Sequence, residues 1–242
     1  WRIKTGKINL PQISKLERWD GKKSLKGKKL LIVGEQGFGD TMLMVRFLPH
    51  FTEQCKSVDL ACKKPLHILF SSLGVRCLDA KDIKEDQYDL YIEMMSIPQH
   101  LEHDWLKWPK GTPLYISDAA KEKMSFINKH NQQRLKVGIV WSGSVTFQQN
   151  AKRSVQIERF LALAAKHPNV QFYSLQKGER EVDMRTSGLG SMIPLGHMLE
   201  NFSETAATLE HMDLVIMTDS SLTHLCGYQN VPQLPSLLAI FP

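Results

Sequence analysis

The sequence predicts an α/β fold made of two Rossmann-like halves, and three observations lead to this prediction. Short apolar runs of strand length alternate with segments of helical spacing, which is the pattern of βαβ units with a mostly parallel sheet. The apolar runs lack a polar face, as expected of strands that helices cover on both sides. Two of the strongest runs lead into glycine-containing turns, at Gly34–Gly39 and Trp141–Ser144, so we expect the unit to occur twice.

Each element follows from the same patterns. Strands are expected at 29–34, 57–62, 89–94, 136–143, 170–176 and 214–219. Helices are expected at 41–55 (interrupted by Pro49), 65–74 (ending at a glycine cap), 117–130 (with Ser117 as N-cap), 157–168, 202–212 and 221–230. The expected division is a basic leader or linker at 1–29, an N-terminal Rossmann-like domain at 30–116 and a C-terminal Rossmann-like domain at 117–242.

Composition favours a soluble globular protein. The 242 residues are 42% hydrophobic and 23% charged. The apolar runs are all shorter than the roughly 18 residues that a membrane span needs. The four cysteines show no CxxC spacing, so we expect reduced thiols in a cytoplasmic protein and no zinc site. The chain starts at Trp1 without an initiator methionine or a signal peptide, which indicates a piece of a longer chain.

The net charge of +6 is unevenly distributed. Residues 1–29 carry a balance of +8, and residues 30–242 a balance of −2. Because the body of the chain is close to neutral, we expect no specific nucleic-acid binding. The basic segment is interpreted either as a solvated leader or as a contact with an acidic partner, an anionic lipid headgroup or a phosphorylated acceptor.

The stretch "LLIVGEQGFGDTM" reads as a buried strand, a glycine-rich turn and the start of a helix. A nucleoside-triphosphate loop would have a lysine where this chain has Asp40, and a dinucleotide fingerprint would have glycine at Met42. Asp40 can therefore be a helix N-cap or a general base that takes a proton from an attacking hydroxyl. The two roles are compatible if one carboxylate oxygen faces the ligand.

A second turn, "IVWSGS", places the backbone N–H groups of Ser142–Ser144 where they can face an anion. Lys152 and Arg153 follow in an expected loop, and two cations suit a diphosphate. Ser154 is a candidate hydroxyl donor or the cap of the next helix. The alternative for these two cations is an ordinary solvated surface.

The stretch "VIMTDSSLTHLCG" takes a strand into a short helix. Asp219 lies at the strand end, where it could accept hydrogen bonds from sugar hydroxyls. Ser220 and Ser221 can cap the helix while their N–H groups bind phosphate. His224 falls one turn into the helix, either facing a ligand or packed as an ordinary core histidine.

Together these segments resemble glycosyltransferase family 9, the group of the lipopolysaccharide heptosyltransferases. The resemblance is strongest to the branch often attached behind tetratricopeptide repeats. It rests on the ordered stretches "LKGKKLLIVGEQGFGDTMLMVRFLP", "YDLYIEMMSIP", "LKVGIVWSGS", "KRSVQIERFLAL", "QFYSLQKGE" and "DLVIMTDSSLTHLCG", which span roughly residues 19 to 232.

The resemblance implies a GT-B architecture, in which two Rossmann-like domains face each other across a cleft. It implies that residues 30–116 are the acceptor domain and residues 117–242 the nucleotide-sugar domain. It implies an inverting, metal-independent transfer of a hexosyl or heptosyl group, with Asp40 as the general base. The acceptor-side loop would be Gly37, Phe38 and Gly39. The donor and nucleotide would contact Ser142, Gly143, Lys152, Arg153, Ser154, Gln176, Lys177, Asp219, Ser220, Ser221 and His224.

The resemblance also implies the ligands and partners. The donor is a nucleotide-diphosphate sugar, which is a substrate, and no cofactor is expected. The acceptor is a saccharide, a lipid-linked group or a protein, and a tetratricopeptide domain is expected upstream. The location would be cytoplasmic, at the inner face of the membrane if the basic segment makes a peripheral contact.

Two other functions are alternatives to glycosyl transfer. The chain stops at Pro242, before the family's closing strand and helix, so the second domain is expected to be incomplete at its C-terminus. This allows a degenerate, non-catalytic nucleotide-sugar-binding or scaffold module. A nicotinamide-dependent oxidoreductase would need a carboxylate after its second strand, where this chain has Cys62-Lys63.

Overall fold

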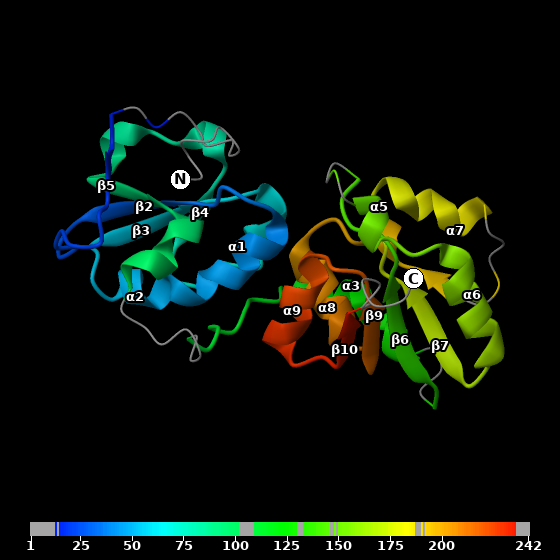
Figure 1. Ribbon diagram of the computed structural model, residues 1–242. Coiled ribbons are helices and arrows are strands. Elements are labelled where there is room, and N and C mark those ends of the chain that lie inside the picture. The colour runs from blue at the N-terminus through cyan, green and yellow to red at the C-terminus, as the bar shows by residue number, and fades with distance from the viewer. Residues whose placement is uncertain are drawn as a thin grey trace. The chain divides into compact units, whose positions relative to one another are not determined.

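The computed structural model describes residues 13, 15–101, 109–129, 133–145, 148, 150–186, 190 and 192–235. The chain divides into two compact units, Trp1–Tyr115 and Ile116–Pro242 (Figure 1). Each unit contains one five-stranded sheet in which every strand pair is parallel. The predicted α/β class with two Rossmann-like sheets is therefore confirmed.

The sheet of the first unit has the strand order β1-β5-β2-β3-β4. Its centre is β2, where Leu30, Leu31 and Ile32 are fully buried, as the apolar run predicted. In register, Leu30 lies opposite Val58 of β3 on one side and Leu90 of β5 on the other. The strands are β1 Glu17–Arg18, β2 Lys29–Val33, β3 Ser57–Ala61, β4 Arg76–Leu78 and β5 Leu90–Glu93.

Helical segments cover this sheet. One face is packed by α1 Phe38–Met44, the 3₁₀ turn η2 Val45–Phe47 and α2 Leu48–Thr52 (Figure 1). The helix expected at 41–55 is thus three shorter pieces. Pro49 lies in the first turn of α2, where backbone N–H groups have no partner within the helix, so the missing N–H of proline costs no hydrogen bond. The remaining 3₁₀ segments are η3 Lys64–Leu66, η4 Ala80–Asp82, η5 Glu85–Gln87 and η6 Met94–His100.

The helix expected at 65–74 was wrong. Only the 3₁₀ turn η3 forms, and turns follow it to Gly74, whose φ is +70°. The apolar spacing that suggested a helix is satisfied without one, because Leu66, Leu69 and Phe70 are all fully buried. Tertiary packing has decided the backbone conformation here.

Part of the expected basic leader belongs to the first unit. Strand β1 pairs in parallel with β5, Trp19 is 4% exposed, and Leu25 is buried. Nε of Arg18 lies 2.7 Å from a carboxylate oxygen of Glu93, which is 1% exposed. The interpretation of residues 1–29 as a solvated leader therefore does not hold for residues 17–25.

The sheet of the second unit has the strand order β10-β9-β6-β7-β8. Its central strand β6 pairs with β7, with Val137 opposite Phe172, and with β9, with Val137 opposite Leu214. The strands are β6 Leu135–Val140, β7 Val170–Ser174, β8 Met192–Pro194, β9 Leu214–Met217 and β10 Gln233–Pro235.

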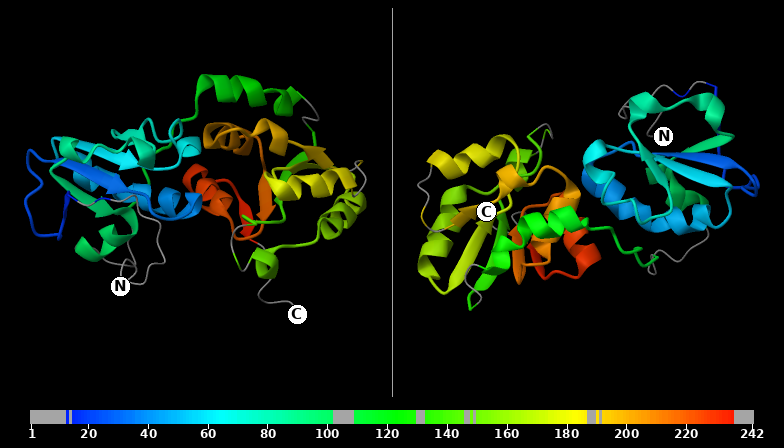
Figure 2. Two further views of the ribbon diagram at one scale, coloured as in Figure 1. Left: turned by 90° about the horizontal axis from the view of Figure 1, so that it is seen from above. Right: turned by 180° about the vertical axis from the view of Figure 1, so that it is seen from behind.

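Helices lie on both faces of this sheet, α6 and α7 on one side and α3, α8 and α9 on the other (Figures 1 and 2). A core cluster that contains Ile139, Trp141, Phe160 and Phe172 joins the sheet to α6. Ser117 caps α3 as predicted, accepting a hydrogen bond from the Ala120 N–H. The segments are α3 Asp118–Met124, α4 Phe126–Lys129, α5 Asn150–Arg153, α6 Ile157–Lys166, η7 Glu179–Val182, α7 Asp183–Thr186, η8 Gly196–Met198, α8 Phe202–Leu209 and α9 Ser221–Gln229.

The strand order fixes where each unit can bind a ligand. In the first unit the chain runs outward from β2 through β3 to β4, then returns to the other side of β2 with β5. The second unit repeats this order with β6, β7, β8 and β9. In open α/β sheets, ligands bind beyond the carboxyl ends of the strands at the point where the order reverses. These switch points lie between β2 and β5 and between β6 and β9.

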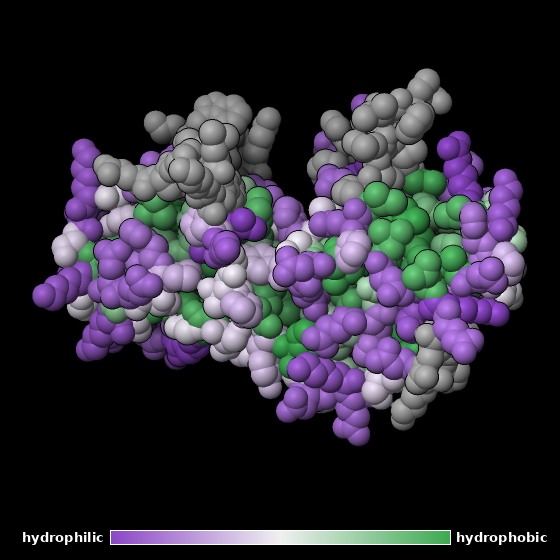
Figure 3. Space-filling model, turned by 90° about the horizontal axis from the view of Figure 1, so that it is seen from below, coloured by the Kyte–Doolittle hydropathy of each residue, from purple (hydrophilic) through white to green (hydrophobic). Residues whose placement is uncertain are grey.

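The surface shows how apolar side chains are distributed. Figure 3 shows hydrophilic side chains over most of the viewed face of the first unit and a group of apolar side chains on the second. The exposed large hydrophobic residues among those described are Ile68, Tyr115, Leu135, Val145, Val182 and Leu234. Within the described residues, no helix is both long and apolar enough to cross a membrane.

The pair of Arg18 with Glu93 gives a test of how firmly β1 is built into the first unit. Arg18→Ala should lower the free energy of unfolding by about 2 kcal/mol, because it leaves a buried carboxylate without its cation. Removing the charge as well, in Arg18→Ala with Glu93→Gln, should recover part of this loss. Urea unfolding followed by circular dichroism measures both.

The control is Lys23→Ala, because Lys23 forms its ion pair with Glu17 at the surface. It should change the unfolding free energy by less than about 0.5 kcal/mol. An equal, small effect of Arg18→Ala and Lys23→Ala would show that the pair of Arg18 with Glu93 adds little to the stability of the unit.

Candidate functional site

The first candidate site begins at the turn between β2 and α1. The Gly34 N–H donates to the Ala61 carbonyl over 2.8 Å, which holds the turn against the end of β3. A Cβ at Gly34 would lie 3.2 Å from that carbonyl oxygen, so the close approach favours glycine. On the other side, the N–H of Met95, after β5, donates to the Glu35 carboxylate over 3.2 Å. The turn is therefore anchored at the switch point of the first unit.

Asp40 is not the N-cap of its helix. Helix α1 starts at Phe38 with Gly37 as N-cap, so Asp40 is the third helical residue. Its Oδ2 accepts a hydrogen bond from the Gly37 N–H over 3.0 Å, and a Cβ at Gly37 would lie 3.2 Å from that oxygen. The carboxylate thus stabilises the helix start from inside the first turn, where negative charge is favourable.

The second oxygen of Asp40 remains available for chemistry. The side chain is half-buried, and Oδ1 accepts no hydrogen bond from the residues that the structure describes. The structural role therefore uses one oxygen and leaves the other able to accept a proton or a hydrogen bond. The Lys63 ammonium lies 4.9 Å from the centroid of the neighbouring Phe38 ring. Gly39, which lies between Phe38 and Asp40 in the sequence, is half-buried.

The second candidate site is organised by the side-chain amide of Gln176. This residue follows β7 and is 2% exposed. Its Oε1 accepts from the Trp141 N–H over 3.1 Å and from the Ser142 N–H over 2.9 Å. Its Nε2 donates to the carbonyls of Ser142 and Lys177. Gln176 therefore holds the loop after β6, and its amide is fully used in doing so.

This amide changes the role expected for Ser142. We expected the Ser142 N–H to face an anion, but it donates to Gln176, and the residue is 3% exposed. The Ser142 hydroxyl accepts from Nδ2 of Asn150 over 2.9 Å and lies 3.0 Å from the Ser154 hydroxyl. Ser142 is thus the centre of a buried network that fixes the loop.

Ser154 belongs to the same network. Its hydroxyl donates to the Asn150 carbonyl over 2.8 Å. It does not cap the following helix, because α6 begins at Ile157 with Gln156 as N-cap. The alternative role as a hydroxyl donor to a ligand is weakened by these internal bonds.

Arg153 is the charged group that joins the two sides of this switch point. Its Nε donates to Asn150 Oδ1 over 3.2 Å, and its Nη1 lies 3.3 Å from Asp219 Oδ2. The guanidinium also covers the loop after β6, since a Cβ at Gly143 would lie 2.5 Å from Nη2. The loop after β6 and the end of β9 therefore meet at one cation, beside a carboxylate that is 80% exposed.

Helix α9 starts beside Asp219. Ser220 is its N-cap, but the Ser220 side chain makes no capping hydrogen bond. The Ser220 Oγ and the Thr218 Oγ1 are both buried and have no hydrogen-bond partner among the described residues. A helix N-terminus whose N–H groups receive no side-chain cap is a suitable place for an anion.

The remaining expected residues lie in or near this region with different exposures. Lys152 and Lys177 are exposed, and neither forms an ion pair with a described residue. Ser221 and His224 are half-buried on α9, and His224 interacts with the surrounding protein. The structure therefore brings Ser142, Gly143, Arg153, Ser154, Gln176 and Asp219 into one connected group, with Ser220 next to it in the chain.

Three residues of this group were missed from the sequence. Asn150 joins Ser142 to Arg153, and its place three residues before Arg153 was the available signal. Asp183 accepts from the buried Trp141 indole N–H over 2.9 Å. Gly196 follows β8 and lies so close to the Gln176 carbonyl that a Cβ would be 1.9 Å from its oxygen. No sequence spacing predicts these last two contacts.

Comparison with known proteins gives similarity of structure alone. No protein-family model matches the sequence, and none of the curated proteins matches it. A glycosyl transferase family 9 structure from Veillonella parvula DSM 2008 is similar with a TM-score of 0.65 at 12% identity, over 87% of this chain and 81% of that one. The E. coli ADP-heptose lps heptosyltransferase II has a TM-score of 0.62 at 12% identity, over 85% and 83%.

A third structure extends the set. The iron-containing dodecameric glycosyltransferase TibC from enterotoxigenic E. coli H10407 has a TM-score of 0.56 at 12% identity, over 87% of this chain and 58% of that one. Since all three are glycosyltransferases, the fold of this chain is that of GT-B glycosyltransferases. The chain is shorter than these neighbours.

The Gln176 amide gives a test of the scaffold under the second site. Gln176→Leu should lower the free energy of unfolding by about 2–4 kcal/mol, because it leaves buried N–H and carbonyl groups of the loop after β6 without partners. Thermal or urea unfolding measures the loss.

The adjacent Lys177→Ala is the matched control, because this side chain is exposed and should shift stability by less than about 0.5 kcal/mol. A Gln176→Leu protein as stable as the Lys177→Ala protein would show that the amide is not needed to hold the loop.

Proposed function

We propose that this protein is a glycosyltransferase that moves a sugar from a nucleotide-diphosphate sugar to an acceptor hydroxyl. The observation that carries the proposal is the position of Arg153, held between the loop after β6 and Asp219 at the switch point of the second unit. The shared fold with glycosyltransferases supports the same activity. The transfer is proposed to be inverting and independent of a metal, with Asp40 as the base.

The donor is proposed to bind at the second switch point. Arg153 and the exposed Lys152 can pair with the two phosphates, and the α9 N-terminus can supply N–H groups near Ser220. Asp219 has an exposed carboxylate that can accept hydrogen bonds from sugar hydroxyls. Ser221, His224 and Lys177 are proposed to complete the donor site. The loop after β6 is held in place by the internal hydrogen bonds of Gln176, Ser142 and Ser154.

The acceptor is proposed to bind at the first switch point, along Gly37, Phe38 and Gly39. Asp40 Oδ1 can take the acceptor proton while Oδ2 keeps its bond to Gly37. Fixing one oxygen orients the other, which is the preorganisation that a general base needs.

The proposed reaction balances without a further reagent. The acceptor oxygen attacks the anomeric carbon from the face opposite the leaving group, and its proton passes to Asp40. The bond between the anomeric carbon and the diphosphate oxygen breaks, and the nucleoside diphosphate leaves with the electron pair. Arg153, Lys152 and the N–H groups of α9 stabilise the negative charge that grows on the leaving group.

The acceptor class and the cellular setting belong to the same proposal. The hydroxyl can belong to a saccharide, a lipid-linked group or a protein. A peripheral contact of the basic N-terminal residues with an anionic membrane, and an upstream tetratricopeptide domain, are also proposed. No cofactor or metal ion is needed for the steps above.

Asp40→Asn tests the base. The asparagine carbonyl can still accept from the Gly37 N–H, so the fold should persist while proton transfer is lost. The turnover number should fall by about 10²–10⁴-fold, with unchanged affinity for the nucleoside diphosphate. Release of nucleoside diphosphate from ADP-, UDP- and GDP-sugars measures turnover. Full activity in a folded Asp40→Asn protein would limit Asp40 to its structural role.

Lys152→Ala tests the donor site. The variant should bind the preferred nucleoside diphosphate about 5–20-fold more weakly, because it loses one cation facing the phosphates. Lys166→Ala, an exposed lysine at the end of α6, is the matched control and should bind normally.

The measurement is thermal stabilisation by ADP, UDP and GDP compared with NAD and NADP. Stabilisation by the nicotinamide cofactors alone would contradict the donor proposal. Nucleoside diphosphate binding without sugar transfer would instead identify a non-catalytic binding module.

A further inference from the structure

Asn150 is a buried amide of the second unit whose role the sequence did not predict. It is the first residue of α5, is 8% exposed, and lies three residues before Arg153 on the same short helix. Residues three apart on a helix are neighbours on its surface, so the two side chains can meet. Oδ1 of Asn150 accepts a hydrogen bond from Nε of Arg153 over 3.2 Å. The guanidinium is therefore held at the nitrogen nearest to the main chain.

The position of Asn150 is itself fixed by the buried network around Ser142. Its Nδ2 donates to Ser142 Oγ over 2.9 Å. Its carbonyl accepts from the N–H of Ser154 over 3.0 Å and from the Ser154 hydroxyl over 2.8 Å. Because the amide is buried, its hydrogen bonds would be costly to lose. Asn150 thus connects the loop after β6 to the guanidinium of Arg153.

The other contacts of Arg153 complete a fixed orientation. Nη1 lies 3.3 Å from Asp219 Oδ2, and a Cβ at Gly143 would lie 2.5 Å from Nη2, so the guanidinium lies against the Gly143 backbone. The Arg153 side chain is 26% exposed and that of Asp219 is 80% exposed. An ion pair with so exposed a carboxylate is screened by water and stabilises little. The amide of Asn150 is the anchor that is shielded from solvent.

A neutral anchor orients the cation without cancelling its charge. Three other arginines donate from Nε to a carboxylate, whose negative charge offsets the positive charge before any ligand arrives. These pairs are Arg18 with Glu93, Arg76 with Asp59 and Arg180 with Asp183. The Nε partner of Arg153 carries no charge, so this hydrogen bond leaves the positive charge intact for an anion.

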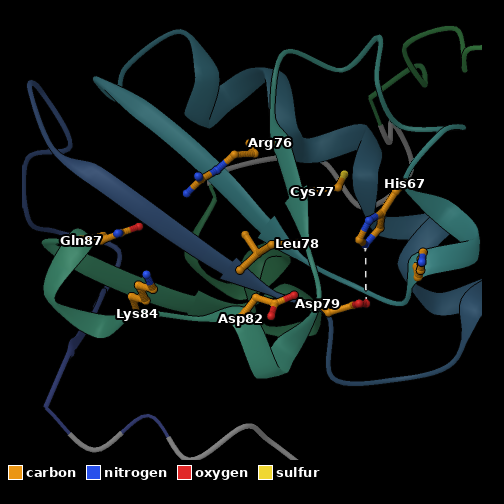
Figure 4. Close-up of a pocket in the computed structure, with 9 residues that line it drawn as sticks. His67, Arg76, Cys77, Leu78, Asp79, Asp82, Lys84 and Gln87 are labelled. Carbon is orange, nitrogen blue, oxygen red and sulfur yellow. Dashed lines mark ion pairs between the residues drawn. The ribbon is translucent and has the colours of Figure 1, made fainter.

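The cavity of the first unit shows the opposite arrangement. It has a volume of about 410 Å³ and lies beside the edge strand β4, with Lys64 and Arg76 among its lining residues (Figure 4). Asp79 and Asp82 line the same cavity, and Arg76 is already paired with the buried Asp59. These carboxylates reduce the attraction of the cavity for an anion. We therefore expect it to be a poorer site for a diphosphate than the region around Arg153.

We propose that Asn150 is a positioning residue for the donor, which holds the Arg153 guanidinium in place for the diphosphate of a nucleotide sugar. The inference rests on the glycosyl-transfer function proposed above and adds a residue to it. Asn150 acts through Arg153 and touches neither phosphate. A guanidinium that is fixed before binding loses less conformational freedom when the diphosphate arrives, which favours affinity. The same cation then faces the charge that grows on the leaving group.

Asn150→Ala tests the anchor by equilibrium binding. The variant should bind the preferred nucleoside diphosphate about 3–10-fold more weakly, because the guanidinium must then be ordered on binding. Isothermal titration calorimetry of the full chain with ADP, UDP and GDP measures the affinity. Asn201→Ala is the matched control, since Asn201 caps α8 with two hydrogen bonds and belongs to none of the proposed donor contacts. It should lower stability without weakening nucleotide binding.

A double substitution separates positioning from general damage to the loop. Lysine keeps the charge at position 153 but has a methylene group where arginine has Nε–H. In an Arg153→Lys protein, adding Asn150→Ala should therefore weaken binding by less than about 1.5-fold further. A further loss as large as in the unsubstituted background would show that Asn150 does not act through Arg153, and would overturn the proposal.

Asn150→Asp tests whether the anchor must be neutral. Aspartate has the shape of asparagine and keeps an acceptor for Nε, so this variant is expected to fold even if alanine is not tolerated. The new carboxylate offsets the charge of Arg153, as Asp59 offsets that of Arg76. The affinity for the nucleoside diphosphate should fall by more than in Asn150→Ala.

The outcomes separate this inference from the proposed function. If the unsubstituted chain binds none of the three nucleoside diphosphates, the donor proposal fails and this inference falls with it. If it binds them, and Asn150→Ala or Asn150→Asp binds them as tightly, this inference alone fails. Weaker binding in Lys64→Ala, with unchanged binding in Asn150→Ala, would place the diphosphate in the cavity beside β4 and would also overturn it.

Discussion

The structure depends on one constraint, which is that all strands of each sheet run in the same direction. Their carboxyl ends then meet at one edge, and residues far apart in the chain become neighbours there. In the second unit this brings the loop after β6, Gln176 after β7, Gly196 after β8 and Asp219 after β9 into one group. Neither the buried network nor the candidate donor site could form if one of these strands were reversed.

Some polar groups at these edges are hydrogen-bonded within the protein and hold the loops in place, and others remain open to a ligand. Gln176 and Ser142 use their hydrogen-bonding capacity on the protein, because each is almost fully buried and unpaired groups there would be costly. Arg153 combines both properties. Three contacts fix its guanidinium, while its partner Asp219 is exposed to solvent. A fixed cation is useful for a diphosphate because binding then orders little further.

The sequence predicted the features that depend on a single short segment, and it did not predict those that depend on residues far apart in the chain. The strands with long buried runs were confirmed, because burial on both faces leaves a plain pattern in one segment. The short edge strands β1, β4, β8 and β10 were missed, since two or three residues give no period to recognise. The helix expected at 65–74 was wrong because its apolar spacing fits buried turns equally well. The amide of Gln176 bonds to residues 34 and 35 positions away, which no local pattern records.

Asp40 shows why structural and chemical roles need not compete. As the third residue of α1, its carboxylate reaches back to the Gly37 N–H with one oxygen. An N-cap position would have pointed the side chain at the N–H groups that follow it in the helix. The observed position instead uses the N–H of the glycine turn, so the bond that stabilises the helix start also orients the carboxylate. A Cβ at this glycine would lie 3.2 Å from the same oxygen, so the position favours glycine. The glycine turn and Asp40 therefore form one structural unit, in which Asp40 stands where a phosphate loop has its lysine, and under the proposed function the free carboxylate oxygen is the base.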